Sequence, residues 1–286
     1  MLREFAPAKV NLALHVTGQC EDGYHELDSL VVFASVGDKL SFREAPSLSL
    51  IVDGPEAAAV PTQSNSVLAA AHLLSPKGTA QITLTKNLPV AAGIGGGTAD
   101  AAAAYRGLSK LWALPAPDAS EQTFTRVAQL GSDVPVCLFS RAARMSGVGE
   151  KIELLPHLPE LHAVLVNPRV EVQTPQVFNA VTDKNNAPMD VLPKSLPDGS
   201  SLIDWISHQR NDMQSAAISI APVISEVLAA IDATPACQLA RMSGSGATCF
   251  GLFPDSEAAW AAEAHILNSR PEWWVRSCTL GDQSAN

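Results

Sequence analysis

The chain contains one stretch that decides how the rest of the sequence is interpreted: Leu88-Pro89-Val90-Ala91-Ala92-Gly93-Ile94-Gly95-Gly96-Gly97-Thr98-Ala99-Asp100. An alternating strand pattern over residues 79–85 precedes it, and an alanine-rich helical pattern over residues 98–111 follows it. Four glycines in five positions leave a backbone without Cβ atoms, at a cost in conformational entropy. At the start of a helix, such a backbone exposes amides beside a positive dipole end, and this arrangement binds phosphate groups.

Two common phosphate-binding motifs do not account for this stretch. No Gly-Lys-Ser/Thr follows the glycines, as a Walker A loop requires, and Thr98 stands where a Rossmann fingerprint needs its third glycine. A tight turn packed between strand and helix is the alternative explanation, and the glycines alone do not separate it from an anion cradle. Thr98 slightly favours the cradle, because its hydroxyl can cap the helix and also contact a phosphate or its Mg²⁺.

Length and composition limit the classes of protein to consider. The 286 residues suffice for about two domains, and the hydrophobic fraction of 47% with 17% charged residues excludes a disordered chain. Nineteen Lys and Arg against 29 Asp and Glu give a net charge of −10. This acidic balance argues against nucleic-acid and membrane partners, but a phosphate ligand needs only backbone amides and one or two lysines.

Cysteine usage and hydropathy indicate the compartment. The five cysteines show no CxxC spacing, which is typical of reduced thiols and not of a disulfide framework or a zinc site. The first residues lack the apolar core of a signal peptide, and no apolar run reaches the roughly 18 residues of a membrane helix. We therefore expect a soluble cytoplasmic protein, either a monomer or a homodimer.

Strand patterns lead and helical patterns follow in blocks, which favours an α+β fold over a doubly wound sheet. The expected strands are 8–16, 27–33, 39–42, 48–52, 79–85, 163–167, 238–242 and 248–253. The expected helices are 66–74, 98–111, 120–130, 175–181, 202–208, 212–220, 222–231 and 256–268. A proline-rich loop is expected at 182–201. We place the domain boundary near residues 156–160, which gives domains 1–157 and 158–286.

Three further segments hold candidate functional residues. Lys9 and Asn11 are two positions apart in an expected strand, so they leave the same face, although the pair taken alone favours an ordinary half-exposed strand surface. Tyr24 and His25 lie at a turn, where they could hold a flat heterocycle or pack at the core edge. Asp133 could cap a helix or serve as a partly buried carboxylate beside a cation.

Taken in order, five segments of the chain resemble the GHMP kinase superfamily, named for galactokinase, homoserine kinase, mevalonate kinase and phosphomevalonate kinase. The segments are Pro7-Ala8-Lys9-Val10-Asn11-Leu12, Asp22-Gly23-Tyr24-His25-Glu26-Leu27, residues 89–98, Gly131-Ser132-Asp133-Val134-Pro135 and Met242-Ser243-Gly244-Ser245-Gly246-Ala247. The second and fourth are most similar to the branch that phosphorylates 4-diphosphocytidyl-2-C-methyl-D-erythritol. The resemblance extends over about residues 6–253.

This resemblance implies a two-lobed α+β fold, with an ATP-binding N-terminal domain and the active site in the cleft between the lobes. The residues that would wrap the ATP phosphates are Pro89, Val90, Ala91, Ala92, Gly93, Ile94, Gly95, Gly96, Gly97 and Thr98. Asn65 and Lys86 fall where the family contacts adenosine. No Asp or Glu stands out as a metal ligand, so Mg²⁺ would rest mainly on the phosphates and Thr98.

The resemblance also implies the chemistry. Asp133 would be the catalytic base for the acceptor 2-hydroxyl, and Lys9 would lie beside it and stabilise charge in the transition state. The acceptor would be a cytidine diphosphate-linked methylerythritol, phosphorylated in the non-mevalonate isoprenoid pathway. The residues that would bind it are Asn11, Tyr24 by stacking on cytosine, His25 by hydrogen bonds to cytosine, Phe178 as a second stacking ring, and Thr174.

Two alternatives are a sister kinase for another small alcohol and a catalytically inactive binding protein on the same scaffold. The Tyr24-His25 pair argues against the first, because an acceptor without a nucleobase has no need of it. Intact Lys9 and Asp133 argue against the second. The chain departs from the family pattern at Ala99, where a second serine is usual. We expect Ala99→Ser to leave the KM for ATP unchanged or to lower it.

Overall fold

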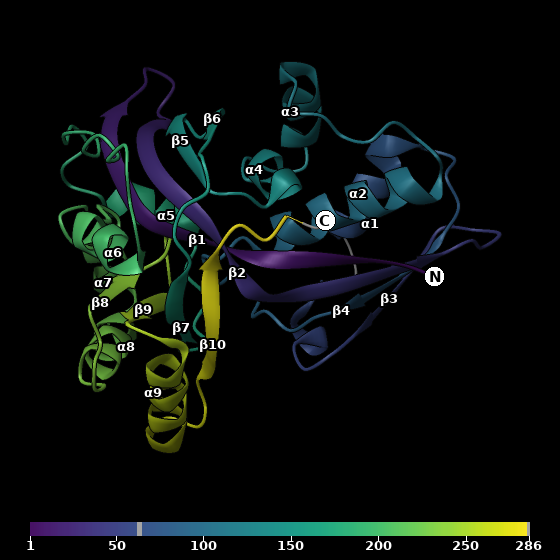
Figure 1. The fold of residues 1–286 in the computed structure, drawn as a ribbon. Coiled ribbons are helices and arrows are strands. Elements are labelled where there is room, and N and C mark those ends of the chain that lie inside the picture. The colour runs from purple at the N-terminus through teal and green to yellow at the C-terminus, as the bar shows by residue number, and fades with distance from the viewer. Residues whose placement is uncertain (62–64, 285–286) are drawn as a thin grey trace.

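Two long paired strands form the centre of the molecule. In the computed structural model, which describes residues 1–61 and 65–284, β1 (Leu2–Gln19) and β2 (His25–Arg43) pair antiparallel along most of their length. They cross most of the width of the molecule (Figure 1). The two shorter strands predicted at 27–33 and 39–42 are one strand in the structure, because Gly37 and Asp38 continue the pairing with Pro7 and Ala6.

One mixed sheet connects the two halves of the chain. The described residues form ten strands, whose main order is β3-β4-β2-β10-β7-β9-β8, with β1 and β5 also paired to β2 and with β6 paired to β5. The further strands are β3 (Ser49–Asp53), β4 (Gln81–Thr85), β5 (Ala143–Gly147), β6 (Lys151–Leu154), β7 (Leu161–Asn167), β8 (Leu239–Met242), β9 (Cys249–Phe253) and β10 (Trp274–Gly281). Among these pairs only β3–β4 is parallel. The last strand, β10, pairs with both β2 and β7 and so joins the halves.

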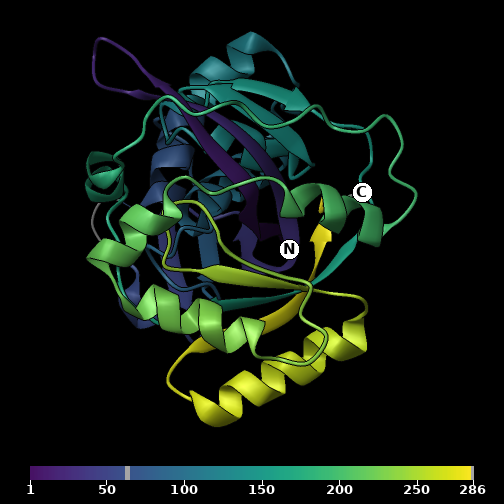
Figure 2. The same cartoon turned by 90° about the vertical axis from the view of Figure 1, so that its left-hand side faces the viewer.

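The helices cover the sheet in two groups (Figures 1 and 2). The N-terminal group consists of the 3-10 turn Ala57–Ala59, α1 (Ser66–Leu74), α2 (Gly96–Leu111), α3 (Glu121–Ala128) and α4 (Val134–Phe139). The C-terminal group consists of α5 (Thr174–Ala180), α6 (Gly199–Ser207), α7 (Gln214–Ile220), α8 (Val223–Asp232) and α9 (Ser256–Ser269). Helix α2 packs along α1 and β1, and α9 packs against β10 and β7.

The predicted elements are present, and five further elements lie outside the predicted ranges: the 3-10 turn Ala57–Ala59, α4, β5, β6 and β10. Helix α1 spans the predicted residues, and α2 begins two residues earlier than predicted, inside the glycine run. Elements α4, β5 and β6 are each six residues or shorter and so offer little periodicity to recognise, although strands as short as β8 and β9 were predicted. Residues 182–198 form the predicted loop, which ends where α6 begins at Gly199.

The hydrophobic core has three clusters, and two of them combine residues from both halves. The cluster around Leu30 is one of the two. It brings Val10 and Leu30 together with Leu165 and Phe250, and the Trp274 indole donates to the carbonyl of Asn87, 3.0 Å away.

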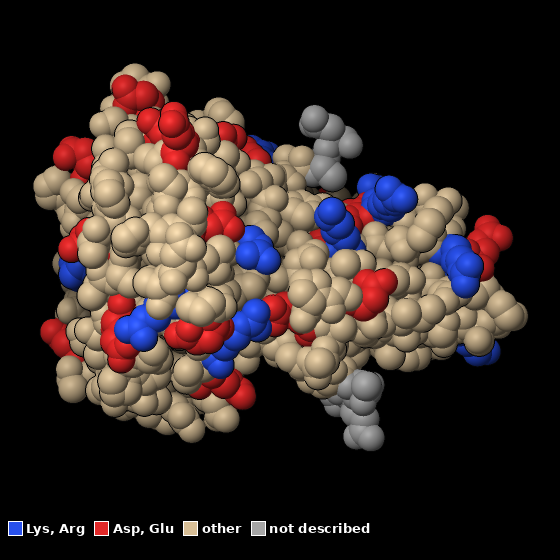
Figure 3. Space-filling view, turned by 90° about the horizontal axis from the view of Figure 1, so that it is seen from below, with Lys and Arg blue, Asp and Glu red and all other residues tan. Residues whose placement is uncertain are grey.

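The division into domains 1–157 and 158–286 remains a prediction. None of the helices among residues 1–61 and 65–284 combines the length and apolar character needed to cross a bilayer. On the face shown in Figure 3, acidic and basic side chains are interspersed.

Candidate active site

A cavity of about 1060 Å³ lies where β1, β2, the glycine-rich loop and the segments before α4 and α5 meet. This volume is at the upper end of the usual range for small-molecule sites. The sequence-predicted residues that line it are Lys9, Asn11, Tyr24, His25, Ala91, Ala92, Gly93, Gly95, Gly96, Gly97, Thr98, Asp133, Thr174 and Phe178. Residues from both halves of the chain therefore share one cavity.

The glycine-rich loop combines close packing with an open helix end. Gly93 has a φ of +72°, and a Cβ there would collide with the backbone of Gly246, so this glycine is required for packing against the Ser243–Gly246 turn. Gly96 and Gly97 open the 16-residue helix α2 on the cavity wall. A Cβ at Gly97 would meet only Ser66 Oγ, 3.9 Å away. The two explanations offered for the glycines therefore both hold: Gly93 lies in a tightly packed turn, and Gly96 and Gly97 expose the first amides of α2.

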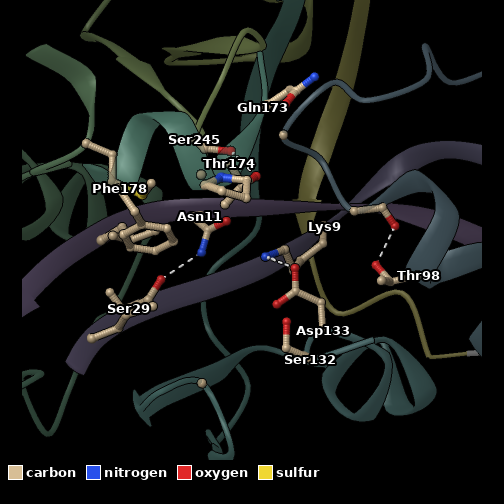
Figure 4. A pocket seen from close by; sticks show the side chains of 18 of the residues that line it. Lys9, Asn11, Ser29, Thr98, Ser132, Asp133, Gln173, Thr174, Phe178 and Ser245 are labelled. Carbon is tan, nitrogen blue, oxygen red and sulfur yellow. Dashed lines mark hydrogen bonds and ion pairs between the residues drawn. The ribbon is translucent and has the colours of Figure 1, made fainter. Parts of the chain in front are cut away.

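Lys9 and Asp133 form an ion pair in the cavity, with 2.8 Å between Lys9 Nζ and Asp133 Oδ2 (Figure 4). The Lys9 side chain is 7% exposed and that of Asp133 is 30% exposed. Asp133 occupies the N-cap position of α4, but its side chain makes no capping hydrogen bond. The carboxylate therefore faces a cation in a cleft, where it can accept a proton from a bound hydroxyl.

Asn11 lies next to this pair on the same strand face, as the two-residue spacing predicts. The pairing of β1 with β2 shifts register between Asn11 and Ala13, and such a bulge re-aims neighbouring side chains. The Asn11 amide nitrogen donates to Ser29 Oγ over 2.8 Å. Its backbone N–H donates to Ser243 Oγ over 3.0 Å.

Aromatic rings gather at the other end of the cavity. His25 stacks on Phe178, with ring centroids 4.8 Å apart and 17° between the planes, whereas Tyr24 is 66% exposed. Burial lowers the pKa of His25, with a smaller effect of the Lys184 charge, so the ring is neutral near pH 7 and one ring nitrogen can accept a hydrogen bond. Nearby, the hydroxyls of Thr174 and Ser245 are 2.8 Å apart.

Comparisons with known proteins agree with this site. Residues 65–141 match the GHMP kinase N-terminal domain and residues 194–269 match the GHMP kinase C-terminal domain. A 4-diphosphocytidyl-2-C-methyl-D-erythritol kinase of Roseobacter denitrificans is 53% identical, over 98% of this chain and 94% of that protein. One of Cereibacter sphaeroides is 54% identical, over 96% of this chain and 98% of that protein. The chain belongs to the 4-diphosphocytidyl-2-C-methyl-D-erythritol kinase family.

Solved structures support the same assignment. A crystal structure of a 4-(cytidine 5'-diphospho)-2C-methyl-D-erythritol kinase superposes with a TM-score of 0.78 at 33% identity, covering 98% of this chain and 99% of that one. A homoserine kinase from Cytophaga hutchinsonii has a TM-score of 0.66 at 18% identity, covering 99% of this chain and 95% of that one, and so shares the fold. The family membership confirms the α+β GHMP kinase fold and the kinase function predicted from the sequence.

Two residues that the family resemblance assigns to adenosine lie outside the cavity lining. Asn65 is 8% exposed and caps α1, where its side-chain oxygen accepts from Val67 N over 2.9 Å. Lys86 is 3% exposed, and its ammonium lies between Asp38 Oδ2 at 2.5 Å and Asp100 Oδ2 at 2.7 Å. The Lys86 side chain is thus bound to two carboxylates and does not reach the cavity. Pro89, Val90 and Ile94 belong to the loop but are also absent from the lining.

The buried Lys86 cluster lies directly beneath the start of α2. A Cβ on Gly96 would come within 3.2 Å of Lys86 Nζ. Burial lowers the pKa of Lys86, but the two carboxylates outweigh it and the net shift is upward. Burial raises the pKa of Asp100 to about 7, and its Oδ1 has no hydrogen-bond partner among the described residues. This kinase therefore keeps a titrating carboxyl below its glycine-rich loop.

The two residues that follow the glycines have different environments. The Thr98 hydroxyl lines the cavity and donates to the carbonyl of Gly95 over 2.8 Å. Thr98 is the third residue of α2 and not its cap, because Gly95 takes the N-cap position. Ala99 is 1% exposed in the core and does not line the cavity. The departure from the family serine at position 99 therefore changes the core behind the loop.

Several cavity residues were not singled out from the sequence. Ser29, Ser66, Glu171, Gln173 and Ser245 all line it. Ser29 was the most recognisable, because it and Asp28 are the two polar residues of the otherwise apolar segment 27–33. Among residues 1–61 and 65–284, no group of three His, Cys, Asp or Glu side chains is arranged to hold a metal ion.

Proposed function

We propose that this chain transfers the γ-phosphoryl group of ATP to the 2-hydroxyl of 4-diphosphocytidyl-2-C-methyl-D-erythritol, in the non-mevalonate isoprenoid pathway. The observation that supports this most directly is the Lys9–Asp133 pair, 2.8 Å apart in a cavity that also holds the open N-terminus of α2. A base, a cation and a phosphate-binding helix end are the parts that a phosphoryl transfer needs.

In the proposed reaction, Asp133 orients the acceptor hydroxyl and accepts its proton. The hydroxyl oxygen forms a bond to the γ-phosphorus while the bond between this phosphorus and the β–γ bridging oxygen breaks, and ADP leaves. Lys9 is only 7% exposed, so its charge is poorly screened and stabilises the negative charge that develops on the transferred group. Both side chains thus act at the reacting atoms, and both are catalytic residues in this proposal.

The donor end of the cavity fits the phosphates of ATP. Gly96 and Gly97 present backbone without Cβ atoms at the start of α2, as a close approach to phosphate oxygens requires. Mg²⁺ commonly binds through one or two protein groups together with the phosphates. The Thr98 oxygen fits that role, because its proton goes to Gly95 and the thiol of Cys137, 3.8 Å away, can occupy only one of its two lone pairs. When bound, the ion would neutralise phosphate charge.

The acceptor end fits a nucleobase. His25 and Phe178 already stack at 4.8 Å, so no ring fits between them. We place the cytosine against Phe178 or His25 from the cavity side, with the exposed Tyr24 closing over it. The neutral His25 then offers a hydrogen-bonding nitrogen to the base. Binding energy from this remote group would be used to hold the reacting hydroxyl at Asp133.

The cytoplasmic location and the monomeric or dimeric state also remain predictions.

A substrate panel tests the proposal. We would measure ADP release from ATP and Mg²⁺ with the purified chain and, in parallel, 4-diphosphocytidyl-2-C-methyl-D-erythritol, free methylerythritol, homoserine and mevalonate. Turnover with the first compound alone is the expected result. Turnover with one of the other alcohols would support the assignment as a kinase but would contradict the proposed nucleobase site. Binding of ATP without turnover of any compound would contradict the proposed reaction.

A further inference from the structure

Ser29 is a buried cavity residue whose hydrogen bonds fix a neighbouring side chain. It lies in β2, is 3% exposed and lines the cavity next to Asn11. Its Oγ is 2.7 Å from the carbonyl oxygen of Ala13 and 2.8 Å from the Asn11 amide nitrogen. Figure 4 shows the Asn11–Ser29 contact beside the Lys9–Asp133 pair.

The direction of these two hydrogen bonds follows from counting protons. A carbonyl oxygen can only accept, so the single Ser29 hydroxyl proton goes to Ala13. Ser29 Oγ must then accept from its other partner, and the group of Asn11 that faces it must be the NH₂. The orientation of the Asn11 amide is therefore set by Ser29, and Asn11 Oδ1 is turned the other way.

Asn11 Oδ1 is buried and has no hydrogen-bond partner among the described residues. A buried acceptor without a partner is unfavourable, and a bound donor would satisfy it. Gly244 of the neighbouring turn lies on this side, and a Cβ there would stand 3.4 Å from this oxygen, so any larger residue at position 244 would crowd a group bound to Oδ1. Asn11 therefore has an open acceptor, Oδ1, on the side away from Ser29, in addition to the second hydrogen of its NH₂ group.

We infer that Ser29 is a positioning residue. By fixing the Asn11 amide, it directs Asn11 Oδ1 to accept a hydrogen bond from one hydroxyl of the alcohol substrate. This inference rests on the proposed function, since it assigns a polyol to this end of the cavity. It predicts that the site binds a substrate with a hydroxyl group at that position more tightly than an analogue without one. The analogue would leave Asn11 Oδ1 without a hydrogen-bond donor.

The experiment combines Ser29 variants with acceptor analogues. Ser29→Ala removes the group that orients the amide, and we expect the Kd and KM for the acceptor to rise about tenfold. The KM for ATP should stay within about twofold. Ser29→Thr keeps the same donor and acceptor and should restore acceptor affinity. The matched control is Ser109→Ala, another buried serine that lies in α2 outside the cavity lining.

Monodeoxy analogues of the acceptor separate this role from general packing. Their binding to wild type and to Ser29→Ala, without ATP, would be measured by calorimetry. For the analogue that lacks the recognised hydroxyl, the two proteins should bind equally, whereas for the other analogues the tenfold difference should persist. If Ser29→Ala does not fold, Ser29→Cys replaces it, since a thiol is a weak acceptor and should give a smaller penalty with the same analogue dependence.

Three outcomes would overturn the inference: an equal loss of ATP and acceptor affinity, no rescue by Ser29→Thr, or a penalty that persists with every analogue. An unchanged acceptor affinity in Ser29→Ala would overturn it as well. These outcomes are distinct from a failure of the proposed function, which would be seen in the wild-type chain as a lack of turnover with the complete acceptor.

Discussion

Asp133 reaches its ion pair with Lys9 instead of capping α4, and this suggests a direct test at the scale of one residue. We expect Asp133→Ala to lower kcat by about 10²- to 10⁴-fold, the usual contribution of a positioned base. Binding of both substrates should remain, because neither the cradle nor the aromatic end is altered. Steady-state kinetics and calorimetry would measure the two effects, with the exposed Glu257→Gln as a control. Near-normal turnover would refute the role of Asp133.

Asp100 gives a second prediction, on pH and stability. Its pKa is raised from 3.8 to about 7 by burial, so between about pH 4 and 7 the folded chain holds a proton that the unfolded chain has lost. The free energy of unfolding must then fall as pH rises through this window. Asp100→Asn removes this dependence, so its Tm relative to wild type should increase by a few degrees between pH 5 and pH 8. A pH-independent difference in calorimetric scans would contradict the assignment.

Single residues show where sequence reasoning ends. Lys9 and Asn11 were expected on one face from their spacing alone, and both line the cavity. The partner of Lys9 lies more than 120 positions away, and only the family resemblance brought the two together. Lys86 is the opposite case: nothing local indicates that Asp38 and Asp100 surround it, so its buried cluster was not predicted. Asn11 was predicted, whereas Ser29, which orients it, was not.

At the scale of elements, different glycines of the glycine-rich loop serve the stability of the fold and the binding of ATP. Gly93→Ala forces a side chain into a φ of +72° and into the backbone of Gly246, so we expect it to destabilise the fold by about 1–2 kcal/mol or more. Gly97→Ala adds a methyl group in open space at the start of α2. It should leave stability equal or up to about 1 kcal/mol higher, while the methyl group raises the KM for ATP.

Thermal unfolding and ATP kinetics of these two variants form one experiment. An unchanged KM for ATP in Gly97→Ala would show that the phosphates do not approach this residue. An unchanged Tm in Gly93→Ala would show that the loop can move away from the Ser243–Gly246 turn. The two variants act as each other's control, because both add the same methyl group within four residues of each other.

Element boundaries were predictable where a local signal exists. Helix α1 begins after Asn65 because this side chain caps it, and a capping residue can be recognised in sequence. Before α4 the sequence offers a capping residue as well, Asp133, but its side chain is directed to Lys9 and does not cap the helix. The pairing of β10 with β2 connects residues about 250 positions apart, and no local pattern specifies such a contact.

At the scale of the whole molecule, the two halves share a sheet and a core. Strand β10 pairs with both β2 and β7, and Leu30 packs in the same cluster as Phe250. We therefore expect one calorimetric unfolding transition, with equal calorimetric and van't Hoff enthalpies. A fragment of residues 1–157 should fail to fold alone, because it would expose these apolar faces and an unpaired strand edge. Two separated transitions would contradict this expectation.

The contact between Gly93 and Gly246 has a consequence for recombining members of this family. The loop from one half and the turn from the other meet through main-chain atoms, including a hydrogen bond of 3.1 Å from Thr248 N to the Ala92 carbonyl. Main-chain atoms are the same in every parent protein, so a chimera with its crossover near residue 158 would keep this junction as long as both glycines are retained. Incompatibilities would arise instead among the mixed side chains of the shared core.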